Sequence, residues 1–167
     1  MKLLEMIQSQ TYYDSIKSLC DKYKFKNGLE IGMAIGQSTV CFLNNTDGHL
    51  TTIDINDNFG VVNKIKQEFG DRWEFIVGDS GTELPKLYEK YDYIYIDGDH
   101  LFAGVLSDIE KCWPLLGKGA VMLLDDYGIT VSPHQIKQAV DHWNNNMKLK
   151  MYHLEGNPNG AVYFIKE

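Results

Sequence analysis

Short apolar runs alternate with amphipathic stretches along most of this chain. Tyr93–Ile96 and Ala120–Leu124 are continuously apolar, as is typical of strands covered on both faces. The longer stretches between such runs are typical of helices. The pattern predicts strands at 28–32, 50–53, 73–77, 93–96, 120–124, 150–154 and 161–165, and helices at 10–24, 37–43 (the start of a helix), 61–69, 84–91, 102–115 (broken by Pro114) and 133–144.

This order of elements predicts the fold class. Five strand–helix repeats indicate a parallel sheet with helices on both faces, and right-handed crossovers make it doubly wound. The last two strands are joined by 155–160 (EGNPNG), which is too short for a crossover helix, so they are expected to pair antiparallel. We therefore predict an α/β fold of one domain over 1–167. Its Rossmann-like sheet has seven strands, mostly parallel with one antiparallel, and binds ligands outside the carboxyl ends of the strands.

Composition narrows the class of protein. A formal net charge of −7 argues against a general nucleic-acid binder, which would present a basic face. The chain has no run of 18 apolar residues, so no membrane span is expected. Glu5 and Gln8 interrupt the apolar run that a signal peptide needs, and we expect a packing helix there instead. The three cysteines lack CxxC spacing and are expected to be buried, reduced thiols of a cytoplasmic protein.

The first three strand ends carry residues suited to a nucleoside. Gly32 and Gly36 occupy the first strand-to-helix turn, where glycine lets the backbone approach a ligand. Asp54 ends the second strand, where a carboxylate can accept both ribose hydroxyls. Asp79 and Ser80 follow the third strand and could meet an adenine edge. A dinucleotide site is disfavoured, because the spacing is ExGxxxG rather than GxGxxG.

Carboxylates gather at the ends of the fourth and fifth strands. Asp97, Asp99 and His100 follow the fourth strand, and Asp125 and Asp126 follow the fifth. Adjacent parallel strands bring these ends to roughly 5 Å of one another. Carboxylates so close repel and raise each other's pKa, which either protonation or a bound cation relieves. An oxygen-rich site of this kind suits Mg²⁺, Mn²⁺ or Ca²⁺.

Five motifs in this order resemble those of a known family. ExGxxxGxS, TIDIN, VGDS, YIDGDH and LLDDY are similar to the motifs of class I S-adenosylmethionine methyltransferases. The IDGDH-x₄-V-x₂-D core resembles a small bacterial family related to catechol-type and macrolide-sugar O-methyltransferases. The resemblance covers roughly residues 10 to 165, and it implies transfer of a methyl group from S-adenosylmethionine to a hydroxyl of a small molecule or sugar.

The resemblance also implies roles for particular residues. It places Glu30, Gly32 and Gly36 against the methionine portion of the cofactor, with Ser38 near its carboxylate. Asp54 would hold the ribose, Ile55 would pack on the adenine, and Asp79 and Ser80 would bracket the adenine edge. The resemblance implies a divalent cation, Mg²⁺ first, on Asp97, Asp125 and Asp126, with Asp97 also bordering the cofactor and His100 as the general base.

Several alternatives stay open from the sequence. Asp99 could cap the following helix, His100 could be structural, and Ser38 could be an ordinary first-turn serine. His134 lacks partner spacing and is expected to be a surface or core residue, and Tyr127 is a candidate for the substrate wall. The chain could be a metal-independent methyltransferase on another acceptor, or a non-catalytic S-adenosylmethionine-binding protein. The short last connection leaves little lid, so a homodimer could complete the acceptor pocket.

Overall fold

The computed structural model describes residues 10–57 and 60–167. The N-terminal residues 1–9, for which the sequence predicts a packing helix, lie outside this description. The strands are β1 (Asn27–Ile31), β2 (His49–Asp54), β3 (Trp73–Val77), β4 (Tyr91–Ile96), β5 (Leu116–Leu124), β6 (Tyr152–His153) and β7 (Val162–Ile165). The α-helices are α1 (Gln10–Tyr23), α2 (Gln37–Asn45), α3 (Val62–Phe69), α4 (Ser80–Glu83), α5 (Phe102–Cys112) and α6 (Ile136–Met147).

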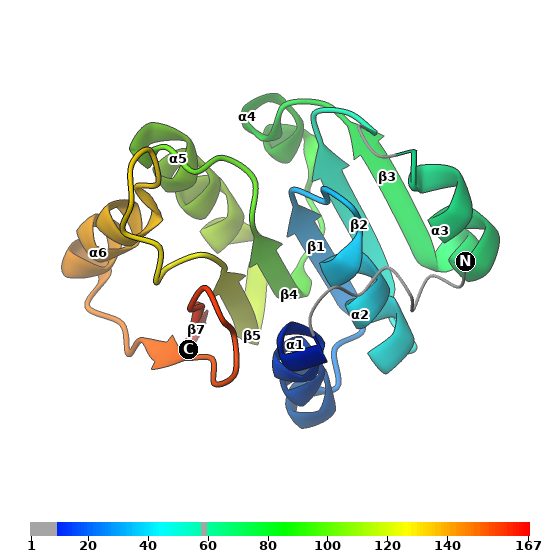
Figure 1. The fold of residues 1–167 in the computed structure, drawn as a ribbon, viewed down its shortest axis with the longest axis horizontal. Coiled ribbons are helices and arrows are strands. Elements are labelled where there is room, and N and C mark those ends of the chain that lie inside the picture. Colours follow the sequence, from blue (N-terminus) through cyan, green and yellow to red (C-terminus); the bar gives the residue numbers. More distant parts are fainter. Residues whose placement is uncertain (1–9, 58–59) are drawn as a thin grey trace.

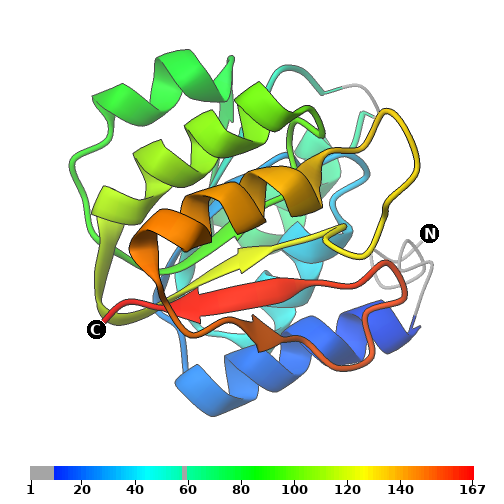
Figure 2. The ribbon, with the colours of Figure 1, turned by 90° about the vertical axis from the view of Figure 1, so that its left-hand side faces the viewer.

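All seven strands form one sheet in the order β3-β2-β1-β4-β5-β7-β6. The pairs among β1 to β5 are parallel, whereas β7 is antiparallel to both β5 and β6. Helices α1, α2 and α3 cover one face, and α4, α5 and α6 cover the other (Figures 1 and 2). The predicted Rossmann-like fold, with one antiparallel strand, is thus confirmed.

Each face of the sheet has its own apolar core. On the α1–α3 face, the ring of Tyr93 stacks on Phe25 and Phe42 with centroids 4.7 and 5.2 Å away. On the other face, Ile94 and Met122 are fully buried beneath α5 and α6. Alternate residues of one strand therefore enter opposite cores, which explains why the central strands are continuously apolar.

Some predicted boundaries are wrong for local reasons. The helix predicted at 84–91 is instead α4 followed by a single 3₁₀ turn (Leu84–Lys86). The last helix begins at Ile136 rather than at 133, because Gln135 has a non-helical backbone (φ −129°, ψ 18°) and donates its amide to the carbonyl of His100 at 2.8 Å. The helix predicted at 102–115 is α5 up to Cys112 followed by a 3₁₀ turn (Trp113–Leu115), so the predicted break occurs around Pro114.

The three cysteines, Cys20, Cys41 and Cys112, are buried and free, as predicted. Within the part of the chain that the structure describes, no helix is long and apolar enough to span a membrane.

Candidate active site

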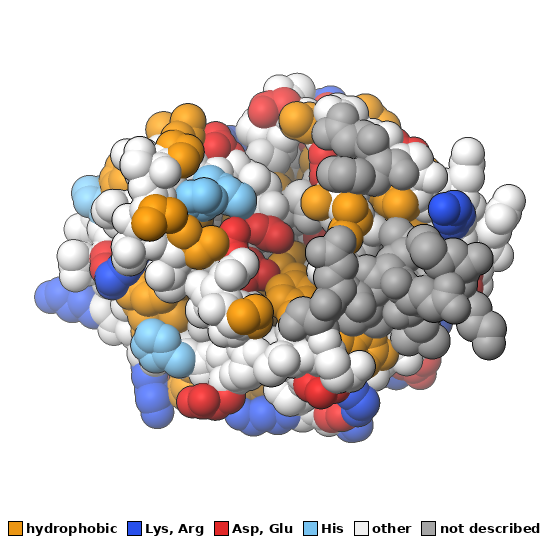
Figure 3. Space-filling view, viewed as in Figure 1, with side chains coloured by type: hydrophobic (Ala, Val, Ile, Leu, Met, Phe, Trp, Pro, Cys, Tyr) orange, Lys and Arg blue, Asp and Glu red, His pale blue; other side chains and the backbone are white. Residues whose placement is uncertain are grey.

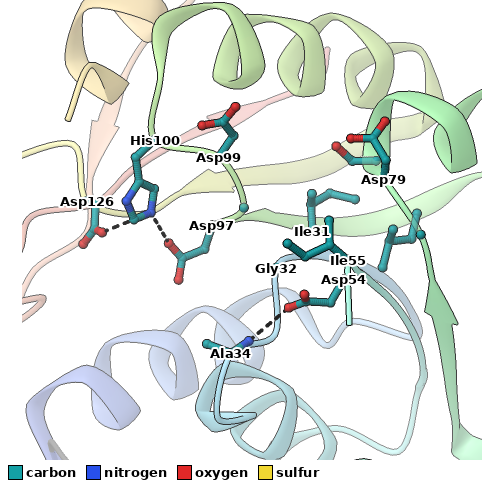
Figure 4. Close-up of a pocket in the computed structure, with 14 residues that line it drawn as sticks. Ile31, Gly32, Ala34, Asp54, Ile55, Asp79, Asp97, Asp99, His100 and Asp126 are labelled. Carbon is teal, nitrogen blue, oxygen red and sulfur yellow. Dashed lines mark hydrogen bonds and ion pairs between the residues drawn. The ribbon is translucent and has the colours of Figure 1, made fainter. Parts of the chain in front are cut away.

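A cavity of about 590 Å³ opens at the carboxyl ends of the parallel strands, where β1 and β4 lie side by side and the strand order reverses. Its size is within the range of small-molecule sites. Figure 4 shows side chains from the ends of β1, β2 and β4 and from the segments after β3 and β5 around it. The predicted residues that line the cavity are Gly32, Asp54, Ile55, Asp79, Ser80, Asp97, His100 and Asp126.

The turn after β1 requires glycine at Gly32. Its φ of 85° is in the left-handed region, and a Cβ there would lie 2.2 Å from the carbonyl oxygen of Asp97. The backbone of this turn is thus pressed against the end of β4. Ala34 also has a positive φ, of 47°, which keeps the turn open toward the cavity.

Asp54 holds the same turn from the end of β2. Its Oδ2 accepts the amides of Met33 at 2.7 Å and Ala34 at 3.2 Å (Figure 4 marks the second of these). Its Oδ1 accepts only a longer bond, 3.3 Å, from the amide of Asn56. One carboxylate oxygen therefore shapes the turn, and the other retains acceptor capacity toward the cavity.

Glu30, Gly36 and Ser38 do not line the cavity. Glu30 is buried in β1, where its carboxylate accepts the hydroxyls of Ser38 at 2.5 Å, Thr39 at 2.6 Å and Thr52 at 2.8 Å. Burial raises the pKa of Glu30 from 4.5 to about 7. Direct contact of these residues with a cofactor stays a prediction. The contacts in the structure instead tie β1, α2 and β2 together beneath the glycine turn.

The raised pKa of Glu30 predicts how stability depends on pH. Between its unfolded value of 4.5 and about 7, the folded protein binds more protons than the unfolded chain, so stability falls as pH rises through this window. The shift corresponds to about 3 kcal/mol. Glu30→Gln, which removes the charge, should flatten the pH dependence of the unfolding free energy in urea. The exposed Glu68→Gln is the matched control, and an unchanged slope in Glu30→Gln would contradict this reading.

Apolar and polar groups share the β2–β3 end of the cavity. Ile55 leaves 66% of its surface exposed beside the cavity. Asp79 is the N-cap of α4 and accepts the amide of Thr82 at 3.1 Å. Ser80 donates its hydroxyl to the carboxylate of Asp108 at 2.6 Å.

The opposite end of the cavity brings a histidine between two carboxylates. His100 Nε2 lies 3.5 Å from Asp97 Oδ1 and 3.6 Å from Asp126 Oδ2 (Figure 4). Burial raises the pKa of Asp97 to about 6, and the contact with Asp97 raises the pKa of His100. Figure 3 shows acidic and histidine side chains side by side at the centre of this face. A proton taken up by His100 is therefore stabilised by two neighbouring carboxylates.

Asp125 is more deeply buried than this group and shares with Asp97 the hydroxyl of Tyr95, which lies 3.4 Å from Asp97 Oδ2. It is 5% exposed and does not line the cavity. Its carboxylate accepts the hydroxyl of Tyr95, the amide of Asp126 at 2.8 Å and the side-chain amide of Asn157 at 3.0 Å. The hydroxyl of Tyr95 also contacts that of Tyr12, from α1. Asp125 thus belongs to a buried polar network that fixes the end of β5.

The structure does not gather the predicted oxygen-only triad of Asp97, Asp125 and Asp126. Among residues 10–57 and 60–167, the potential metal-ligating atoms that lie within 4.8 Å of one another belong to His100, Asp126 and His134. His134, for which the sequence offers no partner spacing, is half-buried, and its ring lies 4.9 Å from that of His100. No sequence spacing could have indicated this, since His134 comes from the segment before α6.

Tyr127, a candidate for the substrate wall, and Asp99, a candidate helix cap, both make hydrogen bonds within the fold. The hydroxyl of Tyr127 donates to Asp141 at 2.7 Å and accepts from Lys137 at 2.9 Å, which ties it to α6, and it does not line the cavity. Asp99 accepts the amide of Leu101 at 2.9 Å and lines the cavity, but the N-cap of α5 is Leu101, so Asp99 does not cap this helix.

A Rossmann-like sheet with its cavity at the switch in strand order defines the chain as a doubly wound α/β protein, a class that binds ligands at this position of the sheet. Residues 29–127 match the family model described as a methyltransferase domain. This match spans more than half of the chain, and the chain therefore belongs to this methyltransferase family.

Solved structures share the whole architecture. A candidate caffeoyl-CoA O-methyltransferase from Staphylococcus aureus is 25% identical, with a TM-score of 0.76, over 96% of this chain and 85% of that one. An O-methyltransferase from Bacillus cereus, solved with S-adenosylhomocysteine, is 20% identical with a TM-score of 0.72, over 95% and 82% of the two chains. A methyltransferase from Podospora anserina, also bound to S-adenosylhomocysteine, is 16% identical with a TM-score of 0.77, over 100% and 82%. A search of curated proteins finds no match.

Proposed function

We propose that this protein transfers a methyl group from S-adenosylmethionine to a hydroxyl of a small molecule or sugar. The observation that carries the proposal is the position of His100. A potential proton acceptor lies between two carboxylates, at one end of a cavity whose other end suits a nucleoside. Membership of the methyltransferase family and the names of the O-methyltransferase neighbours support the reaction class.

The residues around the cavity fit S-adenosylmethionine. The open glycine turn can approach the methionine portion closely, Asp54 Oδ1 can accept ribose hydroxyls, and the exposed side chain of Ile55 can pack on the adenine ring. Two of the solved neighbours were crystallised with S-adenosylhomocysteine, the product of that cofactor.

When bound, the cofactor supplies an electrophilic methyl group on a sulfonium. The protein must then remove a proton from the acceptor hydroxyl, and His100 is positioned to do this with Nε2. The imidazolium formed lies within 3.6 Å of Asp97 Oδ1 and Asp126 Oδ2, which stabilise its charge. A divalent ion on Asp97, Asp125 and Asp126 remains a prediction from the sequence that the contacts of Asp125 do not support, and we assign no step to it.

A panel of acceptors tests this proposal. Purified protein with S-adenosylmethionine should produce S-adenosylhomocysteine when supplied with catechols or hydroxylated sugars. Amine analogues of the same acceptors should give much lower rates. Turnover of amines alone would replace the hydroxyl acceptor by a nitrogen one, and binding without turnover on the whole panel would indicate a non-catalytic cofactor-binding protein.

A further inference from the structure

Three side chains from separate segments converge beside the cavity. They are His100 after β4, Asp126 after β5 and His134 before α6. One potential ligand atom from each lies within 4.8 Å of the other two, and all three residues are half-buried. The ligand atoms of a tetrahedral ion with bonds of about 2.1 Å lie about 3.4 Å apart, close to the 3.6 Å between His100 Nε2 and Asp126 Oδ2.

Hydrogen bonds hold the three residues in place. Asp126 Oδ1 accepts the side-chain amide of Asn159 at 2.9 Å, which leaves Oδ2 directed at His100. Nδ1 of His134 lies 3.2 Å from the carbonyl of Val131. A proton on Nδ1 that donates to this carbonyl leaves the Nε2 lone pair free. Metal-binding histidines are commonly oriented by such a backbone carbonyl or by a carboxylate.

The backbone also joins the segments that carry the two histidines. The amide of Gln135 donates to the carbonyl of His100 at 2.8 Å, and the Gln135 side chain accepts the amide of Phe102 at 2.9 Å. The loop before α6 is therefore fastened to the start of α5. This arrangement positions both rings before any ion arrives, so binding needs only small side-chain rotations.

We propose that His100, Asp126 and His134 form a binding site for one borderline divalent ion, with Zn²⁺ as the reference ion, and that this site does not select Mg²⁺. Two imidazoles and one carboxylate are typical of zinc and related transition ions, whereas Mg²⁺ prefers oxygen ligands in octahedral geometry. The oxygen-only triad expected from the sequence is the alternative, and three donors already contact the carboxylate of Asp125.

The surroundings favour a cation and leave room for a further ligand. Asp97 lies 3.5 Å from His100 and adds negative charge next to the site. His100 and Asp126 line the cavity, so an ion held by them would face it with open coordination positions. An ion bound to His100 Nε2 would occupy the lone pair that the proposed methyl transfer requires. The test below measures ion binding directly, so its result does not depend on the proposed methyltransferase activity.

Calorimetric titration of tag-free, chelator-treated protein with Zn²⁺ tests the proposal. Wild type should bind one ion, and His134→Ala should bind it roughly 100-fold more weakly, because one of three protein ligands is lost. His49→Ala is the matched control, since His49 lies at the opposite, amino end of β2 and should leave the affinity unchanged. No Zn²⁺ binding by wild type, or equal affinity in His134→Ala, would overturn the proposal.

Two further measurements keep this test decisive. Thermal melting of His134→Ala should match wild type without metal, and His134→Gln serves as a second variant if alanine impairs folding. Co²⁺ bound to wild type should give the visible absorption of a low-coordinate ion, and millimolar Mg²⁺ should not displace it. Displacement by Mg²⁺, or the same Co²⁺ spectrum in both His134 variants, would show that the ion binds to other ligands.

Discussion

Replacing His100 by alanine is expected to lower the rate of methyl transfer by about 10²–10⁴-fold, the usual contribution of a general base. The imidazole can accept a proton near neutral pH, and its contacts with Asp97 and Asp126 stabilise the charge that it gains. Single-turnover rates with saturating S-adenosylmethionine measure the effect.

The His100 variant must keep its cofactor site for this result to be informative. The affinity of His100→Ala for S-adenosylhomocysteine should stay close to that of wild type, because the nucleoside end of the cavity is formed by the turn after β1 and the end of β2. His153→Ala, at an exposed histidine of β6, is the matched control and should turn over normally. Full activity in His100→Ala would mean that another group or solvent takes the proton.

Replacing Asp54 by alanine should weaken cofactor binding by roughly 100-fold or more. Hydrogen bonds to a charged group contribute about 1.5–3 kcal/mol each, and a ribose diol bound at Oδ1 would lose this carboxylate entirely. The change also removes the acceptor of the Met33 and Ala34 amides, so the glycine turn loses its anchor. Calorimetric titration with S-adenosylhomocysteine measures both effects together.

Two companion variants separate these effects. Asp54→Asn keeps one acceptor oxygen but loses the charge, and it should bind with intermediate affinity. Asp47→Ala removes an exposed acidic residue that pairs with Lys26 at the far end of the sheet, and it should bind as wild type does. Wild-type affinity in Asp54→Ala would remove Asp54 from the cofactor site and leave it only a structural contact with the turn.

Much of the fold could be predicted from the sequence because its signals are local. Continuous apolar runs mark the buried central strands, and the connection 154–161 is too short for a crossover helix, so β7 pairs antiparallel with β6. The boundaries that failed depend on tertiary contacts. Gln135 delays the start of α6 because it bonds with residues around His100, which are more than thirty positions away in the chain.

The sequence predicts those residues of the candidate site that directly follow the strands of the parallel sheet. Motif order places Asp54, Asp97 and His100 at one cavity, because parallel strands all end at the same edge. The hydrogen bonds that each carboxylate already accepts come from donors in distant segments of the chain. Tyr95 and Asn157 turn Asp125 inward, and no spacing in the sequence indicates that. His134 was missed for the same reason, since only the packing of its loop brings it to His100.

The measurement that tests the central claim most directly is the titration of wild-type protein with S-adenosylmethionine and S-adenosylhomocysteine, with NAD⁺ as the competing class of ligand. We expect one molecule of either methionine-derived nucleoside per chain with micromolar affinity, and no binding of NAD⁺, because the turn after β1 lacks the third glycine of a dinucleotide site. Absence of binding by both nucleosides, or preferential binding of NAD⁺, would contradict the assignment of this cavity as a methyltransferase cofactor site.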